Sequence, residues 1–220
     1  MAQTEQERRP LTRERILETA VRLMDREGLE AVSMRRLGRE LGVEAMSLYN
    51  HVRDKDDVLL GMIETVMTEF EVPDPGADDW VERVRGMARS FRTLLLAHPN
   101  AIPLFTESRG PMRDPEALVP LEAAFDALLG AGLDPEGATH VYRALVGYVM
   151  GYVVLETAGF LSAQAGESWP APDEWARTVP VDRFPRLLQM LPHLMECDSL
   201  VEFEYGLDVM LRGLRDKLGG

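Results

Sequence analysis

Apolar residues recur every three or four positions through most of this 220-residue chain. Ile16, Ala20 and Leu23 follow this spacing, and a longer stripe runs from Trp80 to Leu95. Such a period places side chains on one face of an α-helix, whereas a half-buried β-strand alternates apolar and polar residues. No segment of the sequence alternates in that way, so the pattern predicts an all-α protein.

Polar caps and Gly or Pro breaks set the expected helix boundaries. Thr12, Ser33 and Asp54 can accept the first free N–H groups of a helix, and the Asp-Pro pairs at 114–115 and 134–135 suit the same role. We expect helices over residues 12–28, 33–41, from about 45, 54–70, 79–98, 115–130, 135 to about 160, 185–194 and 199–218, and a mobile loop over 163–174.

Charge is unevenly distributed along the chain, whose formal net charge is −13. Residues 1–57 carry 11 basic and 12 acidic residues, whereas residues 58–220 carry 13 and 25. An acidic protein is a poor candidate for binding nucleic acid unless its positive groups are concentrated locally. Any contact with nucleic acid is therefore expected in the first 57 residues.

Three features bear on where the protein works. The one cysteine, Cys197, cannot form an internal disulfide, and the polar N-terminus lacks the apolar segment of a signal peptide. The longest apolar run, YVMGYVVLETAGFL, contains Glu156 and is too short to span a bilayer. We expect a soluble cytoplasmic protein with no membrane association.

Residues 33–55 combine a short helix, a turn containing Gly42 and a second short helix. This is the arrangement of a helix-turn-helix, in which the first helix braces the second so that the second can enter the major groove of DNA. The apolar residues that would brace the second helix are Leu37, Leu41, Val43, Leu48 and Val52.

The first turns of the second helix would point several side chains outward. Ser47 and Asn50 can hydrogen-bond base edges, and Tyr49, His51 and Lys55 are spaced to reach phosphates. A surface helical hairpin with no DNA-binding role has the same spacing, so the pattern alone leaves both readings open. The other outward residues of these turns are Ala45 and Met46.

The stretch SMRRLGRELGVEAMSLYNHVRDKDDVL resembles the DNA-binding domain of the TetR (tetracycline repressor) family of bacterial transcriptional regulators. The resemblance spans roughly residues 12–70 and implies a three-helix head joined by a helix to a larger ligand-binding and dimerising body. We place the DNA-binding domain at residues 1–57, the linking helix at 54–70, and the ligand-binding and dimerisation domain at 58–220.

The resemblance also implies roles for individual residues. Arg35 matches a base-contacting arginine, Leu48, Tyr49 and His51 match the recognition helix, and Lys55 matches a lysine at the start of the linking helix. Three positions depart from the tetracycline repressor, so we expect shared backbone contacts but a different operator sequence. These positions, where that repressor has glutamine, proline and tryptophan, are Ala45, Met46 and Asn50.

Residues 79–160 are similar to the C-terminal domain of the tetracycline-repressor subgroup, in which each subunit holds an inducer. Leu104 stands where that subgroup has a metal-binding histidine, and Glu156 alone would make a poor metal site. We therefore expect no metal, no cofactor and a mostly hydrophobic effector other than magnesium-tetracycline, while His98 is interpreted as a helix-end residue. The candidate pocket walls, each of which could instead be a plain core residue, are Met87, Phe91, Leu104, Phe105, Met112, Tyr142, Val146 and Met150.

The expected partners are a double-stranded DNA operator, a small-molecule effector and a second copy of the chain, because two half-sites require two heads related by a two-fold axis. Helices 135–160 and 199–217 would form the homodimer interface. An effector would shift helix 79–98 and then helix 54–70, changing the separation of the heads. Two alternatives are a helical small-molecule-binding protein that does not bind DNA and an enzyme, for which no catalytic motif is found.

Overall fold

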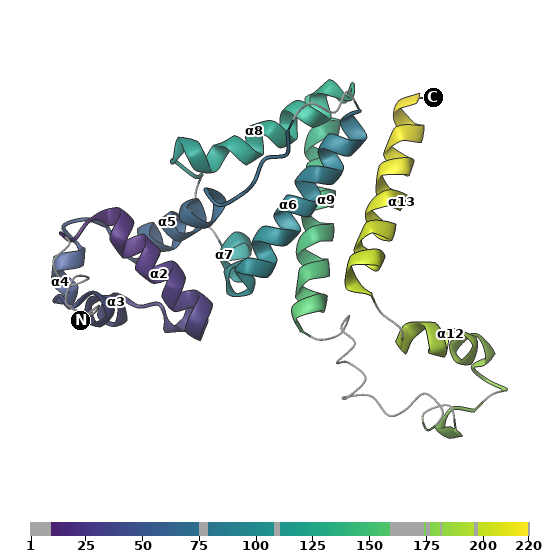
Figure 1. Cartoon of the computed structure of the whole chain (residues 1–220), viewed down its shortest axis with the longest axis horizontal. Coiled ribbons are helices and arrows are strands. Elements are labelled where there is room, and N and C mark those ends of the chain that lie inside the picture. The colour runs from purple at the N-terminus through teal and green to yellow at the C-terminus, as the bar shows by residue number, and fades with distance from the viewer. Residues whose placement is uncertain are drawn as a thin grey trace. The chain divides into compact units, whose positions relative to one another are not determined.

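The computed structural model describes residues 10–74, 79–107, 111–158, 174, 177–180, 182–195 and 198–219. Within these residues the chain forms helices and no strand, which confirms the all-α prediction (Figure 1). The loop expected over 163–174 lies outside the described residues apart from Glu174. Residue contacts divide the chain into two units, 1–142 and 143–220.

Several helices of the first unit begin at the predicted caps. Thr12 and Ser33 each accept the N–H of the residue three positions later, at 3.2 Å. Asp54 does the same for Asp57 at 2.8 Å. The elements are α2 (Arg13–Glu27), η1 (Leu29–Ala31), α3 (Met34–Leu41), α4 (Ala45–Leu48), α5 (Lys55–Met67), α6 (Trp80–Ala97), η2 (Pro99–Ala101), α7 (Ile102–Glu107), α8 (Pro115–Gly130) and the start of α9 (Pro135–Thr157).

The third helix, α4, is shorter than its apolar spacing suggests. Leu48 and Val52 are spaced one helical turn apart, but the helix does not reach Val52. α4 ends at Leu48, and hydrogen-bonded turns continue to His51, whose N–H reaches the Leu48 carbonyl at 2.9 Å. Val52 lies beyond the helix and is nevertheless buried. The chain leaves the helical conformation here because Asp54 must be extended to cap α5.

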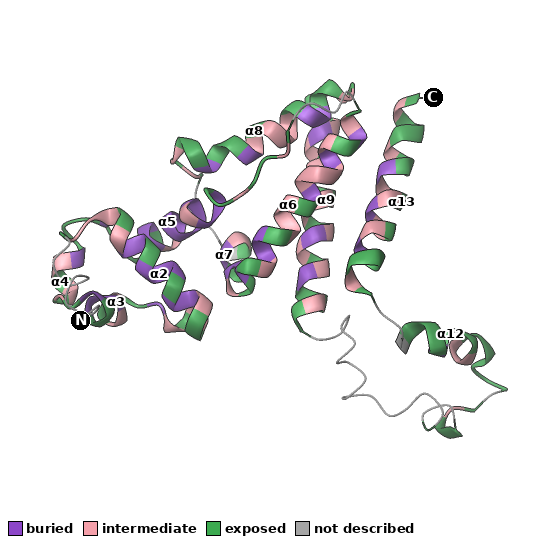
Figure 2. Ribbon diagram, in the orientation of Figure 1, coloured by how far each residue is buried: buried purple, intermediate pink, exposed green. Residues whose placement is uncertain are grey.

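One hydrophobic cluster runs through the first unit. It includes Ile16 of α2, Leu37 of α3 and Leu48 of α4, and it continues through Met62 of α5 to Leu104 of α7. Figure 2 shows the buried stripe of α5 that carries this continuity. The three head helices therefore share their core with the helices that follow them.

The second unit contains the rest of α9, α12 (Pro185–Met195) and α13 (Ser199–Gly219). Its centre is Phe203, whose ring centroid lies 5.5 Å from that of Tyr148 and 5.4 Å from that of Tyr152. The Tyr148 hydroxyl donates to the Phe203 carbonyl at 2.7 Å, and Leu207 is buried one turn further along α13. No helix in the described part of the chain is long and apolar enough to cross a membrane.

Candidate nucleic-acid interface and ligand pocket

The turn between α3 and α4 is fixed by two glycines. Gly42 adopts φ +70°, a left-handed conformation that side chains disfavour, and ends α3. The Val43 N–H donates to the Gly38 carbonyl at 2.9 Å. A Cβ on Gly38 would lie 2.8 Å from the Val43 carbonyl oxygen and 3.1 Å from the Ala45 nitrogen. The backbone of α3 therefore touches the turn directly, which sets the angle at which α4 leaves it.

This turn presents one side of α4 to solvent. Leu48 is 0% exposed and anchors the helix, whereas Met46 is 75% exposed and Tyr49 also lies at the surface. Arg35, Asn50, His51 and Lys55 are exposed, and Ala45 and Ser47 are half-buried. None of the eight predicted DNA-binding residues is buried. We call this set the recognition surface: Arg35, Ala45, Met46, Ser47, Tyr49, Asn50, His51 and Lys55.

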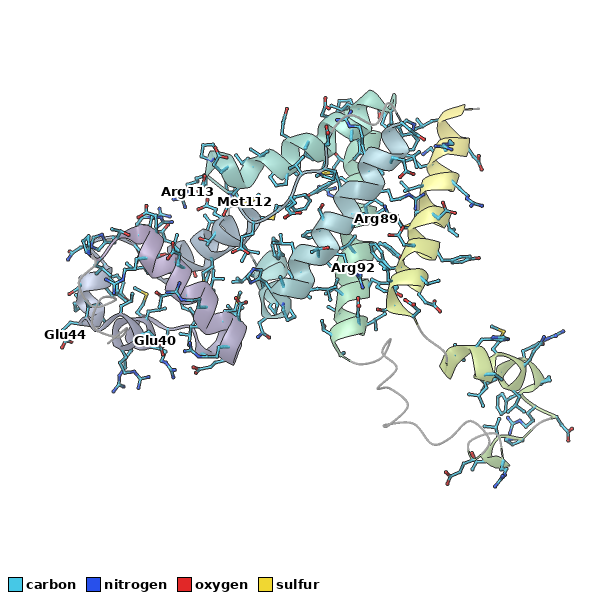
Figure 3. All side chains as sticks on the ribbon, viewed as in Figure 1. Glu40, Glu44, Arg89, Arg92, Met112 and Arg113 are labelled. Atoms are coloured by element: carbon cyan, nitrogen blue, oxygen red, sulfur yellow. The ribbon has the colours of Figure 1, made fainter. Side chains whose placement is uncertain are left out.

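Ion pairs distinguish the basic residues of the head. Arg36 donates to Glu27 at 2.7 Å and to Glu40 at 2.9 Å, and its hydrogen bond lowers the pKa of Glu40. Within the described residues no ion pair involves Arg35 or Lys55, so both charges remain available to an anion. Two acidic residues, Glu40 near the end of α3 and Glu44 just before α4, are labelled in Figure 3.

A buried carboxylate holds the start of α5 to the head. Asp57 is 4% exposed, and it accepts from Arg13 Nη1 at 2.8 Å and from the Arg53 N–H at 3.0 Å. Burial by itself raises the pKa of Asp57, but the hydrogen bonds from Arg13 and Arg53 outweigh that effect and lower it. Because Lys55 is the first residue of α5, this network also positions the Lys55 end of the recognition surface.

The other end of α5 is joined to α8. Glu64 is buried and accepts the backbone N–H groups of Arg113 and Asp114 just before α8 begins. Arg113 and its neighbour Met112 are labelled in Figure 3. α5 therefore connects the head with the element that begins at Pro115.

A pocket of about 390 Å³ lies between α6, α8 and the segment after α5. Its lining is mostly apolar, and Arg83 of α6 is ion-paired with Asp126 of α8 at its side. A mostly apolar wall with one ion pair suits an apolar ligand that carries a polar group. The lining residues are Val72, Pro73, Arg83, Met87, Val119, Glu122, Ala123, Asp126 and Ala127.

The predicted pocket walls are distributed over different environments. Met87 lines the pocket, while Leu104 belongs to the core and Phe91, Phe105 and Met112 pack against it. Tyr142 packs on Phe125 with ring centroids 5.0 Å apart, and burial raises its pKa. The remaining two, which are half-buried in the second unit, are Val146 and Met150.

Sequence reasoning did not select most of the lining residues. Arg83 lies one turn before Met87 on α6, and Glu122 and Asp126 lie one turn apart on α8. That spacing places each pair on one face of its helix. Nothing in the local sequence indicates that this face of α6 meets this face of α8. Among the described residues, no group of three or more His, Cys, Asp or Glu side chains is arranged to hold a metal ion.

A helix-turn-helix with an exposed recognition surface, continuous with a helical body that contains a pocket, defines the class of helix-turn-helix regulators. Within that class, the chain belongs to the TetR family. Residues 16–62 match the model of the bacterial regulatory proteins of the tetR family, and residues 72–218 match the tetracyclin repressor-like C-terminal domain. The predicted resemblance is confirmed, and the members of this family are transcriptional regulators.

Individual relatives agree with this assignment. An HTH-type transcriptional regulator of Saccharopolyspora erythraea is 35% identical over 156 residues, which are 71% of this chain and 65% of that relative. An HTH-type transcriptional repressor of Mycobacterium tuberculosis is 31% identical over 204 residues, covering 90% of this chain and 78% of its own length. The structure of ActR from Streptomyces coelicolor in complex with actinorhodin has a TM-score of 0.81 at 34% identity, covering 96% of this chain and 100% of that one.

Proposed function

We propose that this TetR-family protein is a repressor that binds a palindromic DNA operator as a homodimer and is released by a small, mostly hydrophobic effector. The observation that carries the DNA-binding part is the exposure of Met46 and Tyr49 beside a fully buried Leu48. A helix anchored on one side and open on the other can enter a major groove. Residues of the recognition surface then read base edges or hold phosphates.

The test of DNA binding is selection of bound duplexes from a random pool by the full-length protein. We expect one palindromic sequence to be enriched. Arg35→Ala should weaken binding to the selected duplex by roughly tenfold or more, since a good arginine–base pair contributes about 1–3 kcal/mol. Arg36→Ala removes the same charge from a residue already held by Glu27 and Glu40, so it is the matched control. A pool that shows no enrichment would favour a helical ligand-binding protein that does not bind DNA.

The effector part of the proposal is supported by the pocket beside Met87 and by the ActR complex with actinorhodin. Actinorhodin is the first probe, added to the protein bound to the selected duplex. We expect it, or a compound of similar polarity, to release the DNA. Ala123→Trp would fill part of the pocket and should abolish the response while leaving DNA affinity unchanged. A response of equal size in the filled variant would place the effector elsewhere.

Dimerisation is supported by an apolar stripe on α13. Val201, Tyr205 and Val209 are exposed at intervals of four residues, with Tyr205 at 74%. Leu207 and Leu211 of the same helix are buried within their own unit. The stripe is therefore the part of α13 that a second copy would cover.

Sedimentation at micromolar concentration tests this interface. We expect wild-type protein to sediment at twice its 24.7 kDa mass and Val201→Glu/Tyr205→Glu protein to dissociate. Leu118→Glu places a charge on an exposed apolar site of α8 and serves as the control. A wild-type protein that sediments as a monomer would refute the dimer and the palindromic operator together.

We further propose that the effector acts through α6. This helix contributes Arg83 and Met87 to the pocket, and its end contacts the head. A displacement of α6 would change the position of α5 and the separation of the two heads. A coupling of about 1–3 kcal/mol between the two sites changes DNA occupancy several-fold or more.

A further inference from the structure

His98 ends α6, and its imidazole lies between two carboxylates, one from the DNA-binding head and one from the segment after α5. It is 8% exposed. Its Nδ1 lies 2.9 Å from Asp25 Oδ2, near the end of α2, and its Nε2 lies 3.0 Å from Glu69 Oε2, just after α5. The buried ring thus links the end of α6 to Glu69, 29 residues earlier in the sequence, and to Asp25, 73 residues earlier.

The protonation state of the ring follows from its partners. An ionised carboxylate only accepts hydrogen bonds, and a neutral imidazole has a single N–H to donate. Both contacts can be hydrogen bonds only when both ring nitrogens carry protons. Burial disfavours the charged ring, but the bonds to Glu69 and Asp25 outweigh burial and raise the pKa of His98.

Among the described residues, the ion pairs of His98 are those with Asp25 and Glu69. Asn100, in the turn after His98, is neutral and donates to the carbonyls of Met24 and Asp25 at 3.0 and 3.1 Å. These bonds hold the η2 turn against the end of α2 whatever the state of the ring.

We infer that His98, Asp25 and Glu69 form a proton-dependent joint that fastens the end of α6 to the DNA-binding head. His98 caps the helix that carries the pocket residues Arg83 and Met87. His98 follows Met87 by 11 residues, about 16 Å along a helix at 1.5 Å per residue. The role of the joint in DNA release rests on the proposed function, whereas the joint itself does not.

The direction of the pH dependence follows from linkage. A histidine whose pKa is raised in the docked state stabilises that state below its ordinary pKa, and this contribution is lost as the pH rises through the raised pKa. Above it, one of the two bonds is lost and a ring lone pair faces a carboxylate. The head is therefore held most firmly to α6 under mildly acidic conditions and is loosened under basic ones.

A titration of the four histidines by NMR in the full-length protein tests the charge of the joint. The signal that disappears in His98→Gln is assigned to His98. We expect this residue to titrate at a higher pH in wild-type protein than in Asp25→Asn or Glu69→Gln. An unchanged titration in both carboxylate variants would overturn the inference.

Amide hydrogen exchange tests whether the joint fastens the head. After correction for the intrinsic exchange rate, protection of the last turn of α2 should fall in wild-type protein as the pH rises through the titration of His98. The fall should be roughly tenfold for each unit by which the pKa differs between the docked and undocked states. His98→Gln should lack this dependence, and His140→Gln, which alters an exposed histidine of α9, should retain it.

The outcomes separate the joint from the wider function. If His98→Gln does not fold, Asp25→Asn and Glu69→Gln supply the same comparison, and a pH dependence equal to wild type in both would refute the joint. On a duplex selected by wild-type protein, His98→Gln should show a smaller gain in affinity on acidification. Both proteins retain His51, so its contribution cancels. Failure to select any duplex would count against the proposed function but would leave the exchange result standing.

Discussion

The contact at Gly38 makes a quantitative prediction for Gly38→Ala. The added methyl would meet three backbone atoms: the Val43 carbonyl oxygen at 2.8 Å, and the nitrogen and Cα of Ala45 at 3.1 and 3.3 Å. Backbone atoms cannot rotate away, so α3 and the turn must separate. Overpacking of this kind costs about 1–3 kcal/mol, and alanine recovers about 0.5–1 kcal/mol of helix propensity. From the mid-range values we expect a net destabilisation of about 1 kcal/mol.

Urea unfolding followed by circular dichroism measures this change. Gly130→Ala in the last turn of α8 is the matched control, since no atom lies within 4 Å of the new Cβ. The same chemical change should be neutral or slightly stabilising there. A Gly38→Ala protein as stable as wild type, with unchanged affinity for the selected duplex, would refute the argument that the backbone contact sets the angle of α4.

Three further predictions follow from single contacts. Asp57→Asn should destabilise the protein by about 2 kcal/mol at neutral pH, because Asp57 accepts charged hydrogen bonds from Arg13. Folding lowers the pKa of Asp57, so its stabilising contribution is present above the ordinary carboxyl pKa and is lost as the pH falls through the pKa of the folded state. Urea unfolding should therefore show the stability difference between Asp57→Asn and wild-type protein becoming smaller in acid. Lys55→Ala should weaken duplex binding and reduce the slope of log K against log salt by about 2, because the proposed dimer loses one phosphate contact in each subunit; fluorescence anisotropy measures the slope, and an unchanged slope would contradict the phosphate contact. Tyr148→Phe should lower stability by about 1 kcal/mol through loss of the bond to the Phe203 carbonyl, and calorimetry showing no change would contradict that role.

Local signals in the sequence predicted most helix starts and the exposed side of α4 well. Thr12, Ser33 and Asp54 cap helices because their own side chains reach backbone groups three residues away, which is a property of the local sequence. Leu48 and Met46 are two residues apart, so the anchored and open sides of α4 follow from helical geometry. No end was predicted for α4, which stops at Leu48, a few residues before the extended cap Asp54.

Features that depend on distant residues were not predictable in the same way. The pocket needs Arg83 and Asp126, which are 43 residues apart. His98 was identified as a helix end from the following proline, but its partners Asp25 and Glu69 are fixed only by packing. Likewise, the sequence around Leu104 does not separate a pocket wall from a core residue, and the structure places Leu104 in the core.

The shared core of the first unit has a consequence for exchanging DNA-binding domains between relatives. Leu94 of α6 and Ala101 of η2 are buried in the same cluster as Ile16 and Leu37 of the head. A chimera joined after α5 would graft a foreign head onto these residues without matching their shapes. We expect functional chimeras to require compensating substitutions at Leu94, Ala101 and Leu104. The DNA-binding head of this protein can therefore be exchanged only together with part of the body.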